Sequence, residues 1–234
     1  MAQLHAGEPG FILHARPYQE HSRLIEAFTL NYGRVCLIAR MSAKGSRQQA
    51  LLQPFCPLQL SMLQGRSEIW RLTECNRSGD PFSLPVPQLF SGYYLNELIY
   101  YLLKHGDSAP QLFSCYLATL RSLSDGEAEE RALRVFELKL LQHLGQGLDF
   151  HTQDGKSFKA QQYYCYLPGQ GFVPQLDPQM PSFAGQTLNA LAQGLPQEPQ
   201  LLQVLKQVTR TCIAILLQGR ELKSRQMYQQ YLQL

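Results

Sequence analysis

Cations are concentrated in one stretch near the start of the chain, between residues 34 and 77. Only two carboxylates, Glu68 and Glu74, lie among them. Three of the cations fall in a short segment that also contains Ser42, Gly45 and Ser46, where long side chains can follow a phosphate backbone. The pattern predicts contact with nucleic acid. The cations are Arg34, Arg40, Lys44, Arg47, Arg66, Arg71 and Arg77.

Aromatic side chains in the same part of the chain could stack on bases. Tyr18 and Tyr32 lie beside turns, so we expect them to be exposed. Phe55 and Trp70 are the other available aromatics, and we expect them to fill the core. The predicted DNA-binding residues are therefore Tyr32 together with Arg34, Arg40, Lys44, Arg47, Arg66 and Arg71.

A second group of cations lies in the middle of the chain. Arg131 and Arg134 are expected on one helix, and Arg121 on the helix before it. Exposed apolar residues beside such cations can receive the acidic, hydrophobic end of a peptide. The alternative is a solvated helix face on which Glu127–Arg131 and Glu130–Arg134 pair at i,i+4 spacing.

Motifs of the common enzyme classes are absent from the sequence. There is no G-x-S-x-G, H-E-x-x-H or G-x-x-x-x-G-K-[ST], and no G-x-G-x-x-G between a strand and a helix. The six histidines lack carboxylate or thiol partners nearby in sequence, and the six cysteines include no C-x-x-C pair. The sequence predicts a protein that is not an enzyme and uses no cofactor or metal. A hydrolase assembled from distant residues is a third alternative.

Composition excludes two broad classes. The chain has 234 residues, of which 44% are hydrophobic and 17% charged, so it is not a charged, core-poor disordered chain. No apolar run approaches the roughly 18 residues of a membrane span, and the N-terminus lacks a secretory pattern. We expect a reduced, cytoplasmic protein. The net charge of +3 conceals a basic stretch over 1–80, an acidic one over 81–150 and a basic one over 151–234.

The first 80 residues have the period-two pattern of β-strands. Five short strands are expected, over 11–16, 22–29, 34–39, 51–63 and 68–75, with Pro54 and Pro57 interrupting the fourth. Five strands in so short a segment favour a small closed barrel, and the OB-fold is the commonest barrel of that size. The sequence therefore predicts an OB-fold nucleic-acid-binding domain over residues 1–80.

Helical spacing follows a proline-rich linker at residues 80–87. Helices are expected over 89–102, 111–122, 125–144, 182–195 and 200–217, with Asp125 capping the third and a polar tail after residue 223. A strand over 163–167 lies in an otherwise irregular insert near 148–174. The fold class predicted is α+β: a five-stranded OB-fold barrel followed by a mainly α-helical domain over 81–234.

Several short motifs, taken in order, resemble the RecO family of DNA repair proteins. No single one is decisive, but their order and spacing cover nearly the whole chain. They are FILHARP at 11–17, GRV at 33–35, LQPFCPL at 52–58, YLNEL at 94–98, LRVFEL at 133–138, LGQG at 144–147 and LKSR at 222–225.

The resemblance implies a recombination mediator in the cytoplasm, associated with the nucleoid. Such a protein binds single- and double-stranded DNA, anneals complementary strands and works with RecR, and in some lineages RecF, to load RecA onto SSB-coated DNA. It also implies that the helical domain binds the acidic C-terminal tail of SSB, for which Arg134, Arg121 and Arg131 are the candidates. The rival interpretation is a protein-binding adaptor whose barrel has no direct DNA role.

Two departures from the family pattern are visible. Many relatives carry a four-cysteine zinc site after the Gly-x-Gly segment, whereas this chain has only Cys165 there, so it resembles the zinc-free members. The basic loop after the third strand is also thinner, with Arg40 followed by Lys44 and Arg47.

Overall fold

The structure, a computed structural model, describes residues 2–40, 50–126 and 129–233. It contains two compact units. The first comprises residues 1–127 and 222–234, and the second comprises residues 128–221. The first unit therefore joins the N-terminal strands to helices that lie beyond residue 80. The predicted domain boundary at residue 80 stays a prediction.

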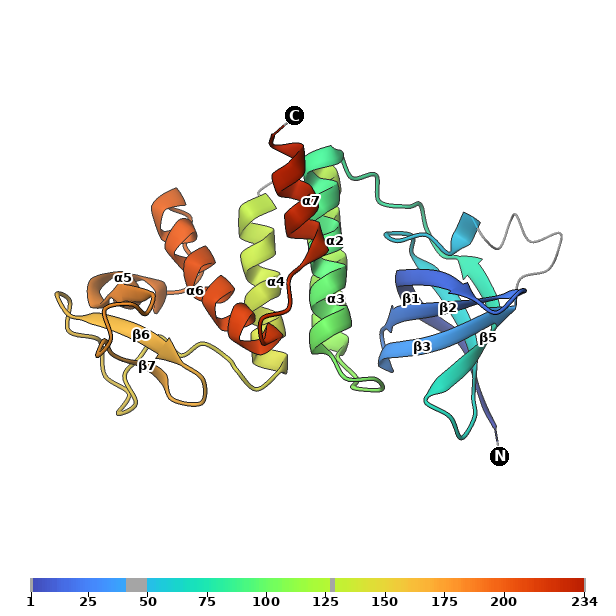
Figure 1. The fold of residues 1–234 in the computed structure, drawn as a ribbon, viewed down its shortest axis with the longest axis horizontal. Coiled ribbons are helices and arrows are strands. Elements are labelled where there is room, and N and C mark those ends of the chain that lie inside the picture. Colours follow the sequence, from blue (N-terminus) through green and yellow to red (C-terminus); the bar gives the residue numbers. More distant parts are fainter. Residues whose placement is uncertain (1, 41–49, 127–128, 234) are drawn as a thin grey trace. The chain divides into compact units, whose positions relative to one another are not determined.

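The N-terminal strands form a closed five-stranded barrel, which confirms the predicted OB-fold class (Figure 1). Its order is β1-β2-β3-β5-β4, and β1 pairs with β4 to close it. Among the described strands of the barrel, only β3 and β5 run parallel. Because Pro54 and Pro57 cannot donate ladder hydrogen bonds, the fourth strand begins after them. The strands are β1 (Gln3–Tyr18), β2 (Ser22–Thr29), β3 (Gly33–Arg40), β4 (Leu58–Gln64) and β5 (Ile69–Arg77).

The barrel core is filled by aliphatic side chains from all five strands and by one indole. Ile12, Ile25, Leu37 and Leu60 are fully buried, and Trp70 packs in the same cluster. Trp70 is thus a core residue, as expected. Phe55 is also buried, but its ring packs against Tyr93 of the first helix, with centroids 5.3 Å apart.

The named helices of the first unit's described residues are α2 (Val86–Leu102), α3 (Pro110–Asp125) and α7 (Lys223–Tyr231). Two predictions about these helices are wrong. Asp125 caps no following helix, because it is the last residue of α3, which Gly126 ends in the left-handed conformation. The expected polar tail is the helix α7, because the Glu97 carboxylate of α2 accepts hydrogen bonds from the first main-chain N–H groups of that helix.

A buried seam joins the barrel to α2 and α3 within this unit. The Asn96 side-chain amide donates to the Leu13 carbonyl of β1, at 3.3 Å, and accepts the Tyr116 hydroxyl, at 2.7 Å. Burial raises the pKa of Tyr116, so its hydroxyl stays protonated and available as a donor. Around these bonds, Phe28 packs against Phe113, with ring centroids 5.4 Å apart.

The second unit contains three helices and a small sheet: α4 (Glu129–His143), α5 (Gly185–Leu191), α6 (Pro199–Leu217), β6 (Tyr163–Leu167), β7 (Gly171–Pro174) and β8 (Ser182–Ala184). The sheet is antiparallel, in the order β7-β6-β8. The helix predicted over 182–195 is wrong at its start, because Phe183 pairs with Tyr164 as strand β8. The buried Phe183 ring then packs edge-on against Phe172.

One glycine contact in the first unit can be tested directly. Gly33 has a φ of 60°, and a Cβ there would overlap the main-chain carbonyl of Asp107, just after α2. Gly106 has a φ of 74°, but a Cβ there would meet no atom within 4 Å. Gly106→Ala should therefore cost only the left-handed backbone penalty of about 1–2 kcal/mol.

Gly33→Ala must also displace the main chain, so we expect it to lower the free energy of unfolding by more than about 3 kcal/mol. Urea unfolding followed by circular dichroism measures both variants. Equal losses for the two would contradict the close approach of Gly33 to Asp107.

Candidate nucleic-acid interface

Three predicted cations are exposed on the barrel. Arg40 ends β3, Arg71 lies on β5, and Arg66 lies in the turn between β4 and β5. Because Ile38 of β3 pairs with Arg71, the strands that carry Arg40 and Arg71 are direct neighbours. None of the three side chains has an ion-pair or hydrogen-bond partner among the described residues. They are free to meet phosphates.

Two other predicted cations, Lys44 and Arg47, lie outside the described residues. Arg40 is the last described residue before them. The barrel therefore presents Arg40, Arg66 and Arg71 as the described members of the predicted DNA-binding group, which we call the barrel cations.

Arg34 has a different environment from the barrel cations. Its Nε lies 3.2 Å from Glu26, and Nη2 lies 2.8 Å from the His105 imidazole. Nη1 donates to the Tyr100 carbonyl, and the guanidinium lies 5.0 Å from the centroid of the Tyr100 ring. These contacts tie β3 to the end of α2 within the first unit. The Arg34 charge is thus already balanced by a carboxylate.

Tyr32 is half-buried rather than exposed. Its hydroxyl lies 2.8 Å from His5 Nδ1, and its ring meets Trp70 edge-on at 5.5 Å between centroids. The sequence could place Tyr32 beside a turn, but it could not show that the side chain folds back onto the core cluster. Tyr18 is exposed, as expected.

The predicted peptide-binding arginines are not equivalent. Arg134 is only 1% exposed, and its Nη2 pairs with Glu137 at 2.7 Å. The Thr209 hydroxyl of α6 donates to the other oxygen of Glu137. Arg134 therefore helps to hold α4 against α6, and the expectation that it lies on a surface is not met. Its partner Glu137, on the same helix, is itself bonded to α6, and spacing within α4 does not reveal this buried arrangement.

Arg131 and Arg121 have more accessible side chains than Arg134. Arg131 is half-buried on α4, whereas Arg121 is exposed on α3, in the other compact unit. The alternative pair Glu130–Arg134 does not form, because Glu130 instead pairs with Lys206 of α6 at 3.0 Å. Glu127, of the other suggested pair, lies outside the described residues.

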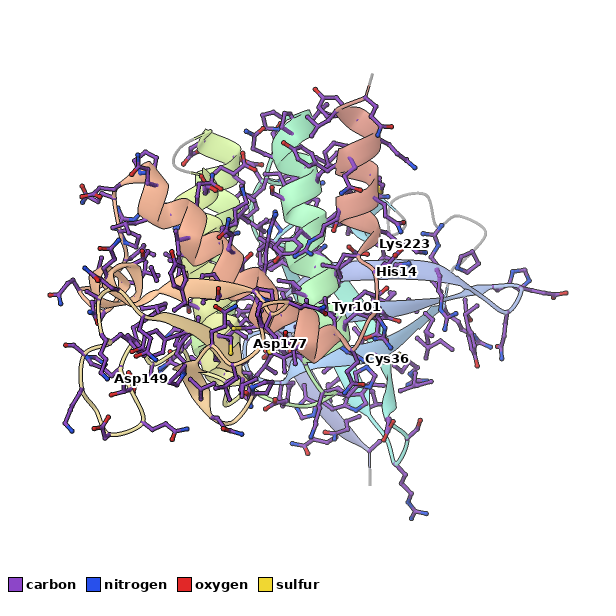
Figure 2. The ribbon with its side chains drawn as sticks, turned by 60° about the vertical axis from the view of Figure 1, so that its left-hand side comes forward. His14, Cys36, Tyr101, Asp149, Asp177 and Lys223 are labelled. Carbon is purple, nitrogen blue, oxygen red and sulfur yellow. The ribbon has the colours of Figure 1, made fainter. Side chains whose placement is uncertain are left out.

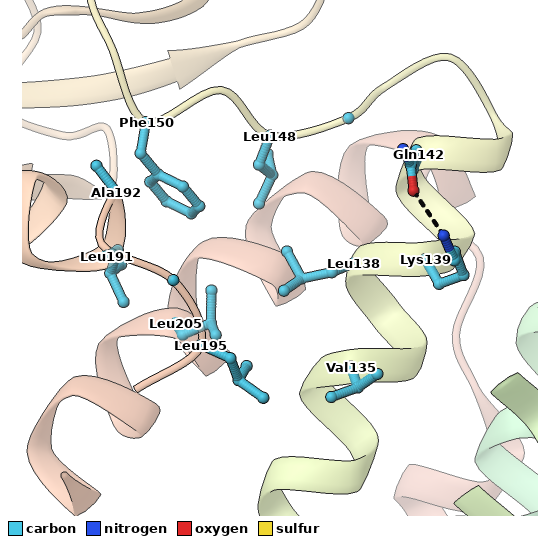
Figure 3. A pocket seen from close by; sticks show the side chains of 12 residues that line it. Val135, Leu138, Lys139, Gln142, Leu148, Phe150, Leu191, Ala192, Leu195 and Leu205 are labelled. Atoms are coloured by element: carbon cyan, nitrogen blue, oxygen red, sulfur yellow. Dashed lines mark hydrogen bonds between the residues drawn. The ribbon is translucent and has the colours of Figure 1, made fainter. Parts of the chain in front are cut away.

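The second unit contains an apolar pocket that was not predicted from the sequence (Figure 3). Its volume is about 500 Å³, and α4 contributes Val135, Leu138 and Lys139 to its lining. The Lys139 ammonium donates to Gln142 at 3.0 Å. We call this the α4–α6 pocket. Its remaining apolar lining comes from Leu148, Phe150, Leu191, Ala192, Leu195 and Leu205.

The thiols do not form a reactive or metal-binding centre in the described part of the chain. Burial raises the pKa of Cys36 and of Cys75 to about 11, and that of Cys212 to about 12, so these thiols are protonated at neutral pH. No group of three His, Cys, Asp or Glu residues there is placed to hold a metal. Cys165 is buried in β6, and the 148–174 insert does not fit a four-thiolate zinc site.

Within the ranges the structure describes, none of the helices has the length and apolar character needed to cross a bilayer.

Comparison with known proteins covers nearly the whole chain. Residues 1–78 match the family model described as Recombination protein O N terminal, and residues 87–226 match Recombination protein O C terminal. The chain is 37% identical to the DNA repair protein RecO of Marinobacter nauticus, over 94% of this chain and 93% of that protein. It is 39% identical to the protein of the same name from Coxiella burnetii, over 94% and 96% respectively.

The buried ion pair of α4 leads to a stability prediction. Glu137→Gln should leave the Arg134 charge buried without its counter-charge, and we expect a loss of about 3–5 kcal/mol in the free energy of unfolding. Glu130→Gln is the matched control, because its pair with Lys206 is partly exposed and should contribute no more than about 1 kcal/mol. Denaturant titration compares the two. A loss no larger for Glu137→Gln than for Glu130→Gln would refute the structural role of Arg134.

Proposed function

Because the chain belongs to the RecO family of DNA repair proteins, we propose that it is a recombination mediator. In this proposal it binds single- and double-stranded DNA, anneals complementary strands and helps to load RecA onto SSB-coated DNA. It has no catalytic site, and RecR, with RecF where that protein takes part, is its partner in loading.

The observation that carries the proposal is the set of barrel cations on a closed barrel. Arg40, Arg66 and Arg71 are exposed and have no counter-charge among the described residues. A closed barrel has no free strand edge between its paired strands, so side chains must make the contacts to a nucleic acid. Arginines without a fixed partner suit phosphates, which are the same in every sequence.

Annealing follows from this kind of contact. Side chains that hold phosphates leave the Watson–Crick edges of the bases free. Two strands held with little sequence preference can then test each other for pairing, and complementarity selects the product.

The DNA proposal predicts a salt dependence. If about four phosphates are neutralised, the logarithm of the affinity for oligo-dT should fall with the logarithm of the salt concentration with a slope near −3, at about −0.7 per phosphate. In the triple variant Arg40→Gln/Arg66→Gln/Arg71→Gln the slope should be shallower by about 2. Fluorescence titration with labelled oligo-dT across a salt series measures it.

The control for that experiment removes the same charge outside the predicted basic stretch. Lys104→Gln/Arg121→Gln/Lys159→Gln changes three exposed cations outside the barrel, and should keep nearly the wild-type slope. Salt-insensitive or absent binding by the wild-type protein would overturn the DNA proposal and favour a protein-binding adaptor.

For the acidic tail of SSB we propose the α4–α6 pocket as the binding site. The pocket is lined mainly by apolar side chains, and Lys139 brings a positive charge to it (Figure 3). An acidic peptide with apolar residues could bury those residues in the pocket and place a carboxylate near Lys139. Arg131 lies on the same helix. Arg134 does not line this pocket, and its buried side chain pairs with Glu137.

The tail proposal predicts that Lys139→Gln weakens binding of an acidic SSB-tail peptide about tenfold, the effect of losing one hydrogen bond to a charged group. Arg121→Gln, in the other compact unit, is the matched control and should bind normally. Fluorescence anisotropy measures the affinities. If Arg121→Gln weakens binding and Lys139→Gln does not, the site lies outside this pocket.

A further inference from the structure

The first unit contains a second pocket, distinct from the barrel cations. It lies where β1 and β2 meet α2 and α7, and its volume of about 610 Å³ is within the range of roughly 300–1,000 Å³ typical of small-ligand sites. Figure 2 labels three residues that line it, His14 of β1, Tyr101 of α2 and Lys223 of α7, which lie near one another in that view. We call it the β1–α7 pocket.

The charged side chains that line the β1–α7 pocket differ in whether they have interaction partners. Its two carboxylates are both engaged: Glu26 pairs with Arg34, and Glu97 accepts the main-chain N–H groups at the start of α7. Its three cations are Arg16, Arg23 and Lys223, and within the described ranges their side chains have neither an ion pair nor a hydrogen bond. Because the N–H groups leave the negative charge of Glu97 in place, the pocket has three cations against one carboxylate, and its net positive charge favours an anion.

Aromatic rings form one wall of the same pocket. Tyr100 is 36% exposed, and its ring is nearly parallel to the His14 imidazole, at 26° and 6.4 Å between centroids. Tyr101 meets Tyr100 edge-on at 4.9 Å. Because Arg34 binds the main-chain carbonyl of Tyr100 and lies over its ring, this wall is held in place.

From cations beside an aromatic wall we infer that the β1–α7 pocket binds one nucleotide of a single strand. The base stacks on the tyrosine wall, and the phosphates on either side of it meet Arg16, Arg23 and Lys223. A nucleotide uses both features of the pocket, because its base has a face that stacks on tyrosine and its phosphates are anionic. This inference rests on the proposed DNA binding and adds a second place on the first unit where a strand is held.

The test compares two triple variants of the full chain by oligo-dT titration across a salt series. Arg16→Gln/Arg23→Gln/Lys223→Gln should make the salt slope shallower by about 1, from the two phosphates that flank the bound nucleotide, whereas the control Lys104→Gln/Arg121→Gln/Lys159→Gln should not. Tyr100→Ala should lower the affinity about tenfold through lost stacking. Circular dichroism melting of each variant verifies that it is folded.

Crosslinking locates the strand without relying on a variant. Oligo-dT carrying 5-iodo-2′-deoxyuridine should crosslink to Tyr100 or Tyr101, as mapped by mass spectrometry, and oligo-dT should compete at far lower concentration than dTMP. Equal competition by dTMP would overturn the assignment to a strand. Displacement of the crosslink by an acidic peptide more efficiently than by oligo-dT would assign the pocket to a protein partner and overturn it too.

The outcomes separate this inference from the proposed function. If the wild-type protein binds with a steep salt slope, but both triple variants behave alike and crosslinks map only to β3 and β5, the pocket is excluded and DNA binding stands. If the wild-type protein does not bind oligo-dT at all, both are overturned.

Discussion

The buried side-chain amide of Asn96 determines how the first unit is put together. It bonds to the main chain of β1 on one side and to Tyr116 of α3 on the other, while its own backbone belongs to α2. An unpaired polar group at this depth would cost about 1–3 kcal/mol, so the three elements favour one mutual arrangement. Since His14 and Arg16 follow the bonded Leu13 carbonyl along β1, the same contact sets the position of the wall and cations of the β1–α7 pocket.

Barrel closure imposes the other constraint. All five strands are paired, so the barrel cannot add a strand from a partner, and any recognition must come from side chains that point outward. Arginines on this outer surface have two different roles. Arg34 is fixed by Glu26 and α2, whereas Arg40 and Arg71 on neighbouring strands have no fixed partner among the described residues. The barrel thus carries one arginine with a structural role and others whose side chains can bind a ligand.

The sequence was sufficient for features that depend on local pattern. Short patterned runs predicted the five strands in order, although β1 begins at Gln3 and β4 only at Leu58, and Trp70 lies in the core as expected. Features that depend on distant partners could not be found this way. The helix α7 relies on Glu97 from α2, and β8 relies on its pairing with β6. Arg134 has the spacing of a surface cation, but Glu137 and the Thr209 hydroxyl of α6 make its buried position possible.

The first unit is interrupted in the chain, because residues 128–221 lie between α3 and α7. During synthesis, Glu97 cannot accept its hydrogen bonds from Lys223 and Ser224 until the whole second unit has been translated. Lys223 is also a cation of the β1–α7 pocket. A nascent or prematurely terminated chain that ends before α7 has all five barrel strands but lacks this pocket. Only the full-length chain can bind a strand there.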